Sequence, residues 1–209
     1  MSTGERIPLE YADRIVRHLA RTFVGLTLDP VGSVRRRSER VGDIEFVAPC
    51  PREGDRDLLW LALSQRFYPA GCVDEIAADD AGGLFGATTP RLERIGDVVQ
   101  GLAPRFRHAR LVLHCVHPER LDVKVEIYRY DPGERGNRGW IELIRTGPGE
   151  FGQACLARWK KLSGGKSDKG YPVDGQGRRY AVASEEAAFS LLKMPWVEPK
   201  VRCWKVVPR

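Results

Sequence analysis

Acidic and hydroxyl-bearing residues in the stretch 31–47, V-G-S-V-R-R-R-S-E-R-V-G-D-I-E-F-V, have types and spacings suited to phosphate and metal chemistry. Asp43 and Glu45 are two residues apart in a predicted strand, so both side chains point to one face. Paired carboxylates on one face can hold a divalent cation. The preceding Gly32-Ser33 turn offers backbone N–H groups and a hydroxyl, which suit a phosphate.

The elements around this stretch are those needed to position it. Ile44 and Phe46 alternate with the acidic residues, so the strand has an apolar face for a core. Apolar residues recur at helical spacing from Leu9 to Phe23, which predicts an amphipathic helix leading into the turn. Three consecutive arginines, at 35–37, place positive charge between the turn and the strand.

Length and composition favour one globular domain, or one with a small appended lobe, because the chain has 209 residues and an ordinary apolar content. The longest apolar run, 58–63, is too short to span a bilayer, and the N-terminus lacks the apolar segment of a secretory signal. The five cysteines are scattered, with no C-x-x-C, which is typical of reduced thiols. We therefore expect an intracellular, cytoplasmic monomer that does not bind membranes.

Positive charge is concentrated in the last third of the chain. The net charge is +6 overall, with a net of −1 over residues 1–144 and +7 over residues 145–209. A basic region beside an acidic strand suits a polyanionic partner, because neutralised phosphates release counterions. This asymmetry predicts nucleic-acid binding.

Periodicity and breaker residues predict the remaining elements. The expected helices cover 57–67, 89–102, 151–162 and the segment from Ser184 to Pro195, and the expected strands cover 110–116, 121–128, 140–145 and 180–183, with a loop or hairpin at 163–179.

Two separate motifs resemble the family X DNA polymerases of the polymerase beta type. The first is G-S-x-R-R followed by G-D-x-E, from Gly32 to Glu45, and the second is P-W-V-E-P-K-V-R, from Pro195 to Arg202. The resemblance implies an α+β fold: a nucleotidyltransferase palm with a mixed sheet and flanking helices over 1–148. A small basic α/β lobe over 149–209 would contact the nascent base pair and DNA. It also implies a minimal form without the N-terminal lyase domain.

The resemblance assigns three catalytic, metal-binding carboxylates, Asp43, Glu45 and Glu126, and two Mg²⁺ or Mn²⁺ ions. Glu126 is chosen because it faces away from the apolar side of a strand that precedes Thr146-Gly147, with a short insertion at the hairpin tip. Asp122 on the same strand is the competing candidate.

The resemblance also assigns two sets of binding residues. The nucleotide-binding set is Gly32, Ser33, Arg36, Gly42, Thr146 and Gly147. The DNA-binding set is Arg158, Lys160, Lys161, Lys166 and Lys169.

The implied activity is gap-filling DNA synthesis in repair or mobile-element replication, with nucleoside triphosphates added to a primer 3′-OH and pyrophosphate released. The chain departs from the family at Glu45 and Glu126, where Asp is usual, and at Ile144-Arg145, where aromatic residues are usual. We expect Mn²⁺ tolerance and loose sugar selection. Two alternatives remain: transfer to an RNA end, a protein or a small molecule, and a degraded palm that only binds DNA.

Overall fold

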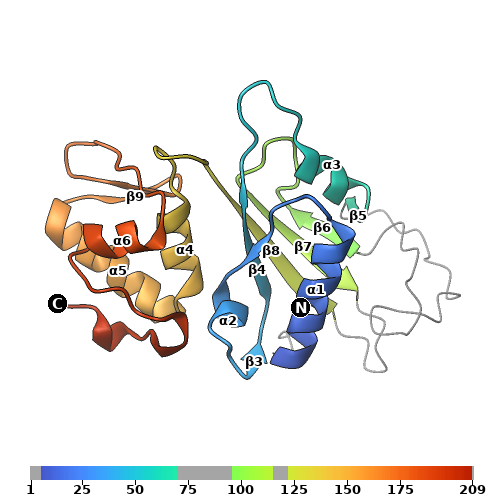
Figure 1. Ribbon diagram of the computed structural model, residues 1–209, viewed down its shortest axis with the longest axis horizontal. Coiled ribbons are helices and arrows are strands. Elements are labelled where there is room, and N and C mark those ends of the chain that lie inside the picture. The colour runs from blue at the N-terminus through green and yellow to red at the C-terminus, as the bar shows by residue number, and fades with distance from the viewer. Residues whose placement is uncertain (1–5, 70–95, 115–121, 209) are drawn as a thin grey trace, which may run out of the picture.

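The computed structural model describes residues 6–69, 96–114 and 122–208. It has a mixed α+β fold with two lobes, one built on a sheet and the other mainly helical (Figure 1). Within the described ranges no helix combines the length and apolar character needed to cross a membrane.

The sheet lobe contains the first elements of the chain, and the helix predicted over 9–23 is confirmed as α1. The elements before residue 70 are β1 (Ile7–Pro8), α1 (Leu9–Thr22), β2 (Asp29–Pro30), α2 (Gly32–Arg35), β3 (Arg40–Val41), β4 (Ile44–Pro49), α3 (Leu58–Ser64) and β5 (Phe67–Pro69). The next are β6 (Gly96–Gln100), β7 (His108–His114) and β8 (Asp122–Tyr130).

The main sheet has six strands in the order β2-β4-β8-β7-β6-β5. It is mixed, as predicted, because β4 pairs with β8 and β5 with β6 in parallel, whereas the other neighbours are antiparallel. The antiparallel pair predicted around residues 117–120 is confirmed as β7 and β8. The connecting residues 115–121 lie outside the described ranges.

The two faces of this sheet have different roles. One face, with Ile44, Phe46, Val125 and Ile127, is buried in a hydrophobic core that α1 covers. The opposite face, with Val47 and Tyr128, packs against Ile141 of α4 on the side of the helical lobe (Figure 1), and Glu45 alternates onto this face. The alternation of apolar and acidic residues seen in the sequence therefore sends the carboxylates into the space between the lobes.

The helical lobe has its own core. Its elements are α4 (Arg138–Thr146), α5 (Gly149–Ser163), β9 (Lys166–Asp168), β10 (Tyr171–Val173), α6 (Glu185–Leu191) and two 3₁₀ helices, η1 (Pro199–Val201) and η2 (Trp204–Val206). Trp140 and Leu143 of α4 pack there with Phe151, Trp159 and Phe189. The expected boundary at residue 148 would assign α4 to the first lobe. The structure instead packs Trp140 and Leu143 of α4 into the core of the helical lobe.

Several local predictions in this lobe hold. The helix predicted over 151–162 is α5, and the expected hairpin within 163–179 is formed by β9 and β10. Ser184 caps α6 as predicted, because its hydroxyl accepts a hydrogen bond from the Ala187 N–H. The helix predicted over 57–67 is the shorter α3, capped by Asp57.

Three local predictions were wrong. The strand predicted over 140–145 is the helix α4, whose apolar residues divide between two clusters: Trp140 and Leu143 pack in the lobe, and Ile141 packs toward the sheet. The helix predicted over 89–102 is contradicted at 96–100, which form β6, and residues 89–95 lie outside the described ranges. The segment predicted as a strand over 180–183 is not one. The Tyr180 N–H bonds to the Pro172 carbonyl and the Val182 N–H to the Gly136 carbonyl, so the segment does not pair along a single strand.

Candidate functional site

Three predicted carboxylates lie together on the lobe-facing side of the sheet. Asp43 immediately precedes β4, and Glu45 of β4 is the register partner of Glu126 on the parallel strand β8. Burial and the negative charges of Asp43 and Glu126 together raise the pKa of Glu45 to about 7. Burial and the charge of Glu126 also raise the pKa of Asp43. The three groups therefore repel one another, as carboxylates at a cation site do.

Glu126 differs from the other two because cationic and hydroxyl groups already contact it. Its carboxylate accepts hydrogen bonds from Arg110 Nε at 2.7 Å and from the Tyr128 hydroxyl, and His108 Nε2 lies 3.6 Å away. Burial disfavours the charged carboxylate, but these hydrogen bonds outweigh burial and lower the pKa of Glu126. Within the described ranges no cluster of three or more His, Cys, Asp or Glu side chains is arranged to hold a metal ion.

The competing carboxylate, Asp122, is at the start of β8. It is exposed, and its Oδ1 lies 2.8 Å from Nδ1 of His114. It pairs with His114 of β7, whereas Glu126 is the register partner of Glu45 and its charge raises the pKa of both Asp43 and Glu45. The structure therefore groups Glu126, rather than Asp122, with the acidic residues of β4.

The glycine-serine turn lies directly against Glu45. Gly32 has φ +63°, and a Cβ built there would come within 2.0 Å of Glu45 Oε2, so a larger residue would displace that carboxylate. The buried Ser33 hydroxyl has no hydrogen-bond partner among the described residues. An unpaired buried hydroxyl carries a desolvation cost, which a bound oxyanion could remove. Gly42 has room for a side chain, because a Cβ there would meet only Arg6, at 3.9 Å.

Arg36 connects the turn to the other predicted nucleotide-binding segment. Its Nη1 donates to the Thr146 carbonyl at 2.5 Å and to the Gly147 carbonyl at 3.0 Å. Burial lowers the pKa of Arg36, and the nearby charges of Glu45 and Asp43 oppose that effect. Two segments about 110 residues apart thus meet beside the acidic residues.

Sequence reasoning missed a buried ionic cluster behind this site. Glu185 at the start of α6 accepts hydrogen bonds from Arg35 at 2.9 and 3.1 Å and from Arg202 at 2.8 Å. Arg35 also donates to the Thr146 hydroxyl at 2.7 Å. Burial disfavours the charged form of Glu185, but the hydrogen bonds and positive charges of Arg202 and Arg35 outweigh burial and lower the pKa of Glu185. Arg202 ends the second sequence motif, and that position was the available signal.

A second missed residue is Arg145, at the place where the family usually has an aromatic side chain. Its guanidinium carbon lies 3.7 Å from the centre of the Tyr128 ring. Tyr128 in turn donates to Glu126. The positive charge of Arg145 also acts on Glu45, lowering its pKa against the effect of burial. Arg145 is therefore part of the same electrostatic environment as the carboxylates.

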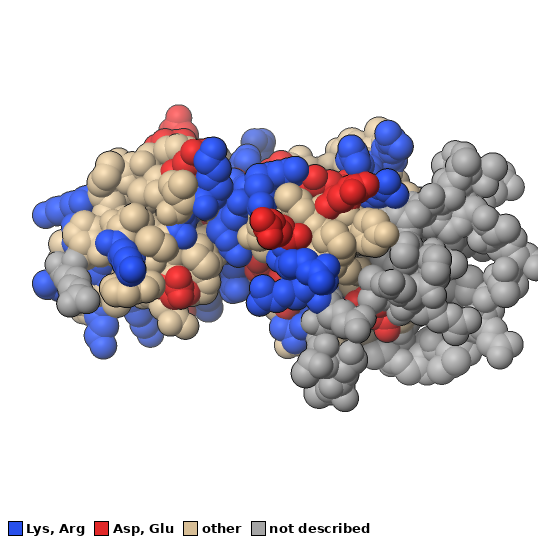
Figure 2. Space-filling view, turned by 90° about the horizontal axis from the view of Figure 1, so that it is seen from below, with Lys and Arg blue, Asp and Glu red and all other residues tan. Residues whose placement is uncertain are grey.

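The predicted DNA-binding residues divide into two kinds. Arg158 donates to the carbonyls of Leu192, Lys193 and Pro208 at 2.5, 3.1 and 2.9 Å, so it tethers the end of the chain. The lysines are exposed: Lys160, Lys161, Lys166 and Lys169. Figure 2 shows Lys and Arg side chains along the junction of the two lobes, beside Asp and Glu side chains.

Chemically, the site combines acidic groups that could bind cations, a glycine-serine turn whose hydroxyl has no partner in the described part of the chain, and partly buried arginines. Comparisons with known proteins do not identify a family: no protein-family model matches this chain, and no curated protein shows a significant match to it.

Proposed function

We propose that this chain is a metal-dependent nucleotidyltransferase that adds nucleotides to a DNA 3′ end at short gaps. The observation that carries the proposal is the contact between the Gly32-Ser33 turn and Glu45, with Asp43 and Glu126 beside it. A triphosphate at the turn would lie next to carboxylates able to hold its cations. The proposal places the protein inside the cell, where such substrates occur.

The donor set fits Mg²⁺ or Mn²⁺ in its chemistry. Asp43 and Glu45 supply hard oxygen ligands, and a cation would relieve the repulsion that raises their pKa values. Glu126 would be the third ligand and would first have to release Arg110. When bound, two such ions activate the attacking hydroxyl and stabilise charge on the leaving pyrophosphate.

The remaining residues would bind the substrate. The Ser33 hydroxyl would donate to a phosphate oxygen, because it has no described protein partner. Arg36 would supply positive charge near the phosphates, as its guanidinium is adjacent to Glu45 and Asp43. Thr146 and Gly147 would border the sugar, held in place by Arg36.

DNA binding is assigned to the exposed lysines and not to Arg158. Lys160 and Lys161 are exposed on α5, so neutralising them should weaken DNA binding and reduce its salt dependence without changing stability. The variant Lys160→Gln/Lys161→Gln, measured by fluorescence anisotropy over a salt series, tests this assignment. An unchanged salt slope would place the DNA contact elsewhere.

The ion pair between Glu126 and Arg110 favours one alternative, a DNA-binding module without catalysis. A carboxylate neutralised by a fixed arginine is a weaker metal ligand. In this alternative the chain binds DNA but adds no nucleotide with either metal.

The deciding experiment is extension of a labelled primer on one-nucleotide-gapped DNA, with each nucleotide supplied separately and with Mg²⁺ or Mn²⁺. Templated addition that is lost in Asp43→Asn and retained in Asp122→Asn would support the proposal. Addition without regard to the template would indicate a terminal transferase. DNA binding without any addition would favour the binding module.

A further inference from the structure

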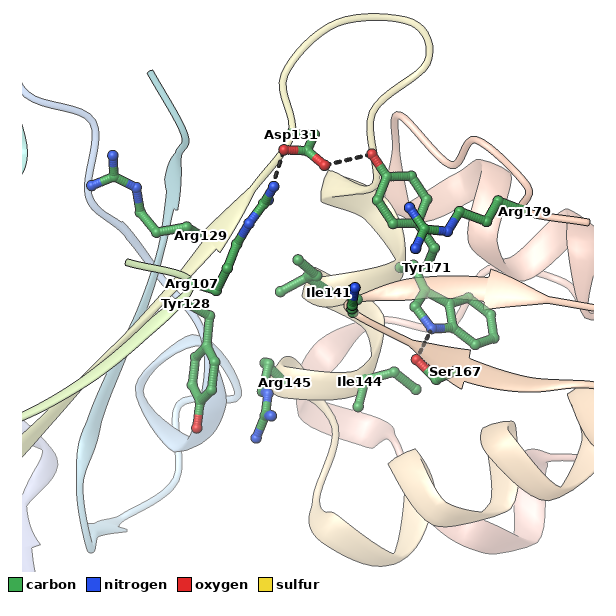
Figure 3. Close-up of a pocket in the computed structure, with 13 residues that line it drawn as sticks. Arg107, Tyr128, Arg129, Asp131, Ile141, Ile144, Arg145, Ser167, Tyr171 and Arg179 are labelled. Atoms are coloured by element: carbon green, nitrogen blue, oxygen red, sulfur yellow. Dashed lines mark hydrogen bonds and ion pairs between the residues drawn. The ribbon is translucent and has the colours of Figure 1, made fainter. Parts of the chain in front are cut away.

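A pocket of about 360 Å³ lies between the sheet and the helical lobe, beside the C-terminal end of β8 (Figure 3). No carboxylate of the proposed catalytic site and no residue of the glycine-serine turn lines it. Its walls come from β8, from α4 and from the hairpin of β9 and β10. The lining residues are Arg107, Tyr128, Arg129, Asp131, Trp140, Ile141, Ile144, Arg145, Ser167, Lys169, Gly170, Tyr171 and Arg179.

Cationic residues outnumber acidic ones in the lining of the pocket. Arg107, Arg145, Lys169 and Arg179 line it, and part of their charge is offset because Arg179 lies 3.6 Å from Asp168, which does not line the pocket. Arg129 contributes little charge to it, because its guanidinium points away from the pocket (Figure 3) and pairs with Asp57 at 2.9 Å.

Among the described residues, Asp131 is the one carboxylate that lines the pocket, and pocket residues already contact it. Arg107 Nη1 donates to Asp131 at 2.7 Å, and the Tyr171 hydroxyl donates to the other oxygen at 2.7 Å (Figure 3). These contacts lower the pKa of Asp131 although burial opposes them. Asp131 thus links the end of β8 to β10 and neutralises only part of the positive charge.

The pocket also has apolar walls. Ile141, Ile144 and Tyr171 line it together with Tyr128 and Trp140. The Tyr128 ring is already stacked on the His108 ring at 4.6 Å and covered by Arg145, and Trp140 is only 1% exposed. The Trp140 indole N–H is satisfied by Ser167 Oγ at 3.0 Å, so it does not need a ligand group.

Two of the cations are presented on these rings. The guanidinium carbon of Arg179 lies 5.4 Å from the centre of the Tyr171 ring, and that of Arg145 lies 3.7 Å from the Tyr128 ring. Stacked guanidinium groups keep their N–H edges available for bidentate contacts with an anion. A ligand that has both an oxyanion and a planar ring would match this combination.

We propose that this pocket is a second nucleotide-binding site, separate from the carboxylates, that takes a phosphorylated nucleoside. Lys169, Arg179 and Arg107 would bind the phosphate, because the fork-shaped guanidinium groups of arginines match phosphate oxygens. The base would lie against Ile141 and Ile144 of α4 and the Tyr171 ring of β10. The volume is at the lower end of the range for small-molecule sites, which favours a single nucleotide unit.

Two sources can supply such a unit: a free nucleoside monophosphate and the phosphorylated end of a nucleic-acid strand. Either would bridge the two lobes where Asp131 already joins them. This binding does not depend on nucleotidyl transfer, so it stands or falls separately from the proposed function.

The test is isothermal titration calorimetry of the full chain in EDTA, which keeps metal from the carboxylates. The titrants are nucleoside 5′-monophosphates, a 5′-phosphorylated oligonucleotide, its unphosphorylated counterpart and inorganic phosphate. The test variant is Lys169→Gln/Arg179→Gln, whose two side chains are exposed at the pocket rim. The matched control is Arg178→Gln, on the neighbouring residue, whose side chain is 72% exposed and does not line the pocket.

We expect one saturable site that persists in Asp43→Asn and in the control, and whose affinity falls about tenfold or more in the double variant, because phosphate contacts are lost. Binding of the free monophosphate would identify that source, and binding of the phosphorylated strand alone would identify the strand end. Inorganic phosphate binding as tightly as the nucleotides would overturn the role of the apolar wall. Binding that the double variant leaves unchanged, or no binding of any titrant, would overturn the proposal.

Discussion

Removing the charge of Glu45 should make the protein more stable at neutral and alkaline pH. The carboxylate is largely buried beside Asp43 and near Glu126, which together with burial raise its pKa to about 7 from the ordinary 4.5. Ionisation of Glu45 therefore opposes folding. Glu45→Gln keeps the shape of the side chain and removes that charge.

The size and sign of the effect follow from linkage. A group whose pKa is raised on folding destabilises the folded state once pH exceeds its unfolded pKa, and the cost is complete above its folded pKa. A shift from 4.5 to about 7 corresponds to about 3 kcal/mol near pH 8 and about 1 kcal/mol near pH 5. The stability advantage of Glu45→Gln should grow with pH over this window.

Urea unfolding in EDTA, near pH 5 and near pH 8, measures the difference in the free energy of unfolding. Glu53→Gln is the matched control, because Glu53 is exposed in the loop after β4. Replacing EDTA with Mn²⁺ should stabilise the wild type and remove most of the advantage of Glu45→Gln, since an ion held at the proposed site would favour the folded state. A variant no more stable than the wild type near pH 8, or an advantage independent of pH, would refute the electrostatic reasoning.

Three further substitutions test contacts within the helical lobe and, at Glu185, its link to the sheet lobe, each measured by urea unfolding. Glu185→Ala should lower the free energy of unfolding by about 3–5 kcal/mol, because it leaves the fully buried Arg202 without its carboxylate; a loss below about 1 kcal/mol would contradict this. Gly139→Ala should lower the free energy of unfolding by about 3 kcal/mol or more, because a Cβ there would lie 1.8 Å from the Ser184 carbonyl oxygen. A variant of near-normal stability would show that α4 and α6 can move apart at little energetic cost. Arg158→Ala should cost about 2 kcal/mol by leaving three carbonyl groups without their donor, and loss of DNA affinity at unchanged stability would reverse that assignment.

Local features of the candidate site could be predicted from the sequence because they depend on short-range geometry. The spacing from Gly32 to Glu45 brings a turn and a strand face together, and the structure shows the two in contact. Alternation along 121–128 placed Glu126 on the side opposite Val125 and Ile127, as observed. Such patterns fix which face a side chain occupies.

Helix and strand assignments failed where local pattern and tertiary contacts compete. The apolar run that begins at Trp140 is compatible with either period. It forms a helix because Trp140 and Leu143 fill one core while Ile141 meets the sheet. Intrinsic preference over so short a run is weak beside the burial of a tryptophan.

The assembly of the site was decided only by tertiary structure. The sequence determined that Asp43 and Glu45 share a face, and that a glycine-serine turn precedes them. It did not determine that β8 would pair in parallel with β4 and place Glu126 opposite Glu45, because sheet pairing joins residues whose separation in the chain carries no local signal. The same holds for the ionic cluster of Glu185 with Arg35 and Arg202. Glu185 and Arg202 become neighbours when the helical lobe folds, and Arg35 joins them only because the sheet lobe packs against it.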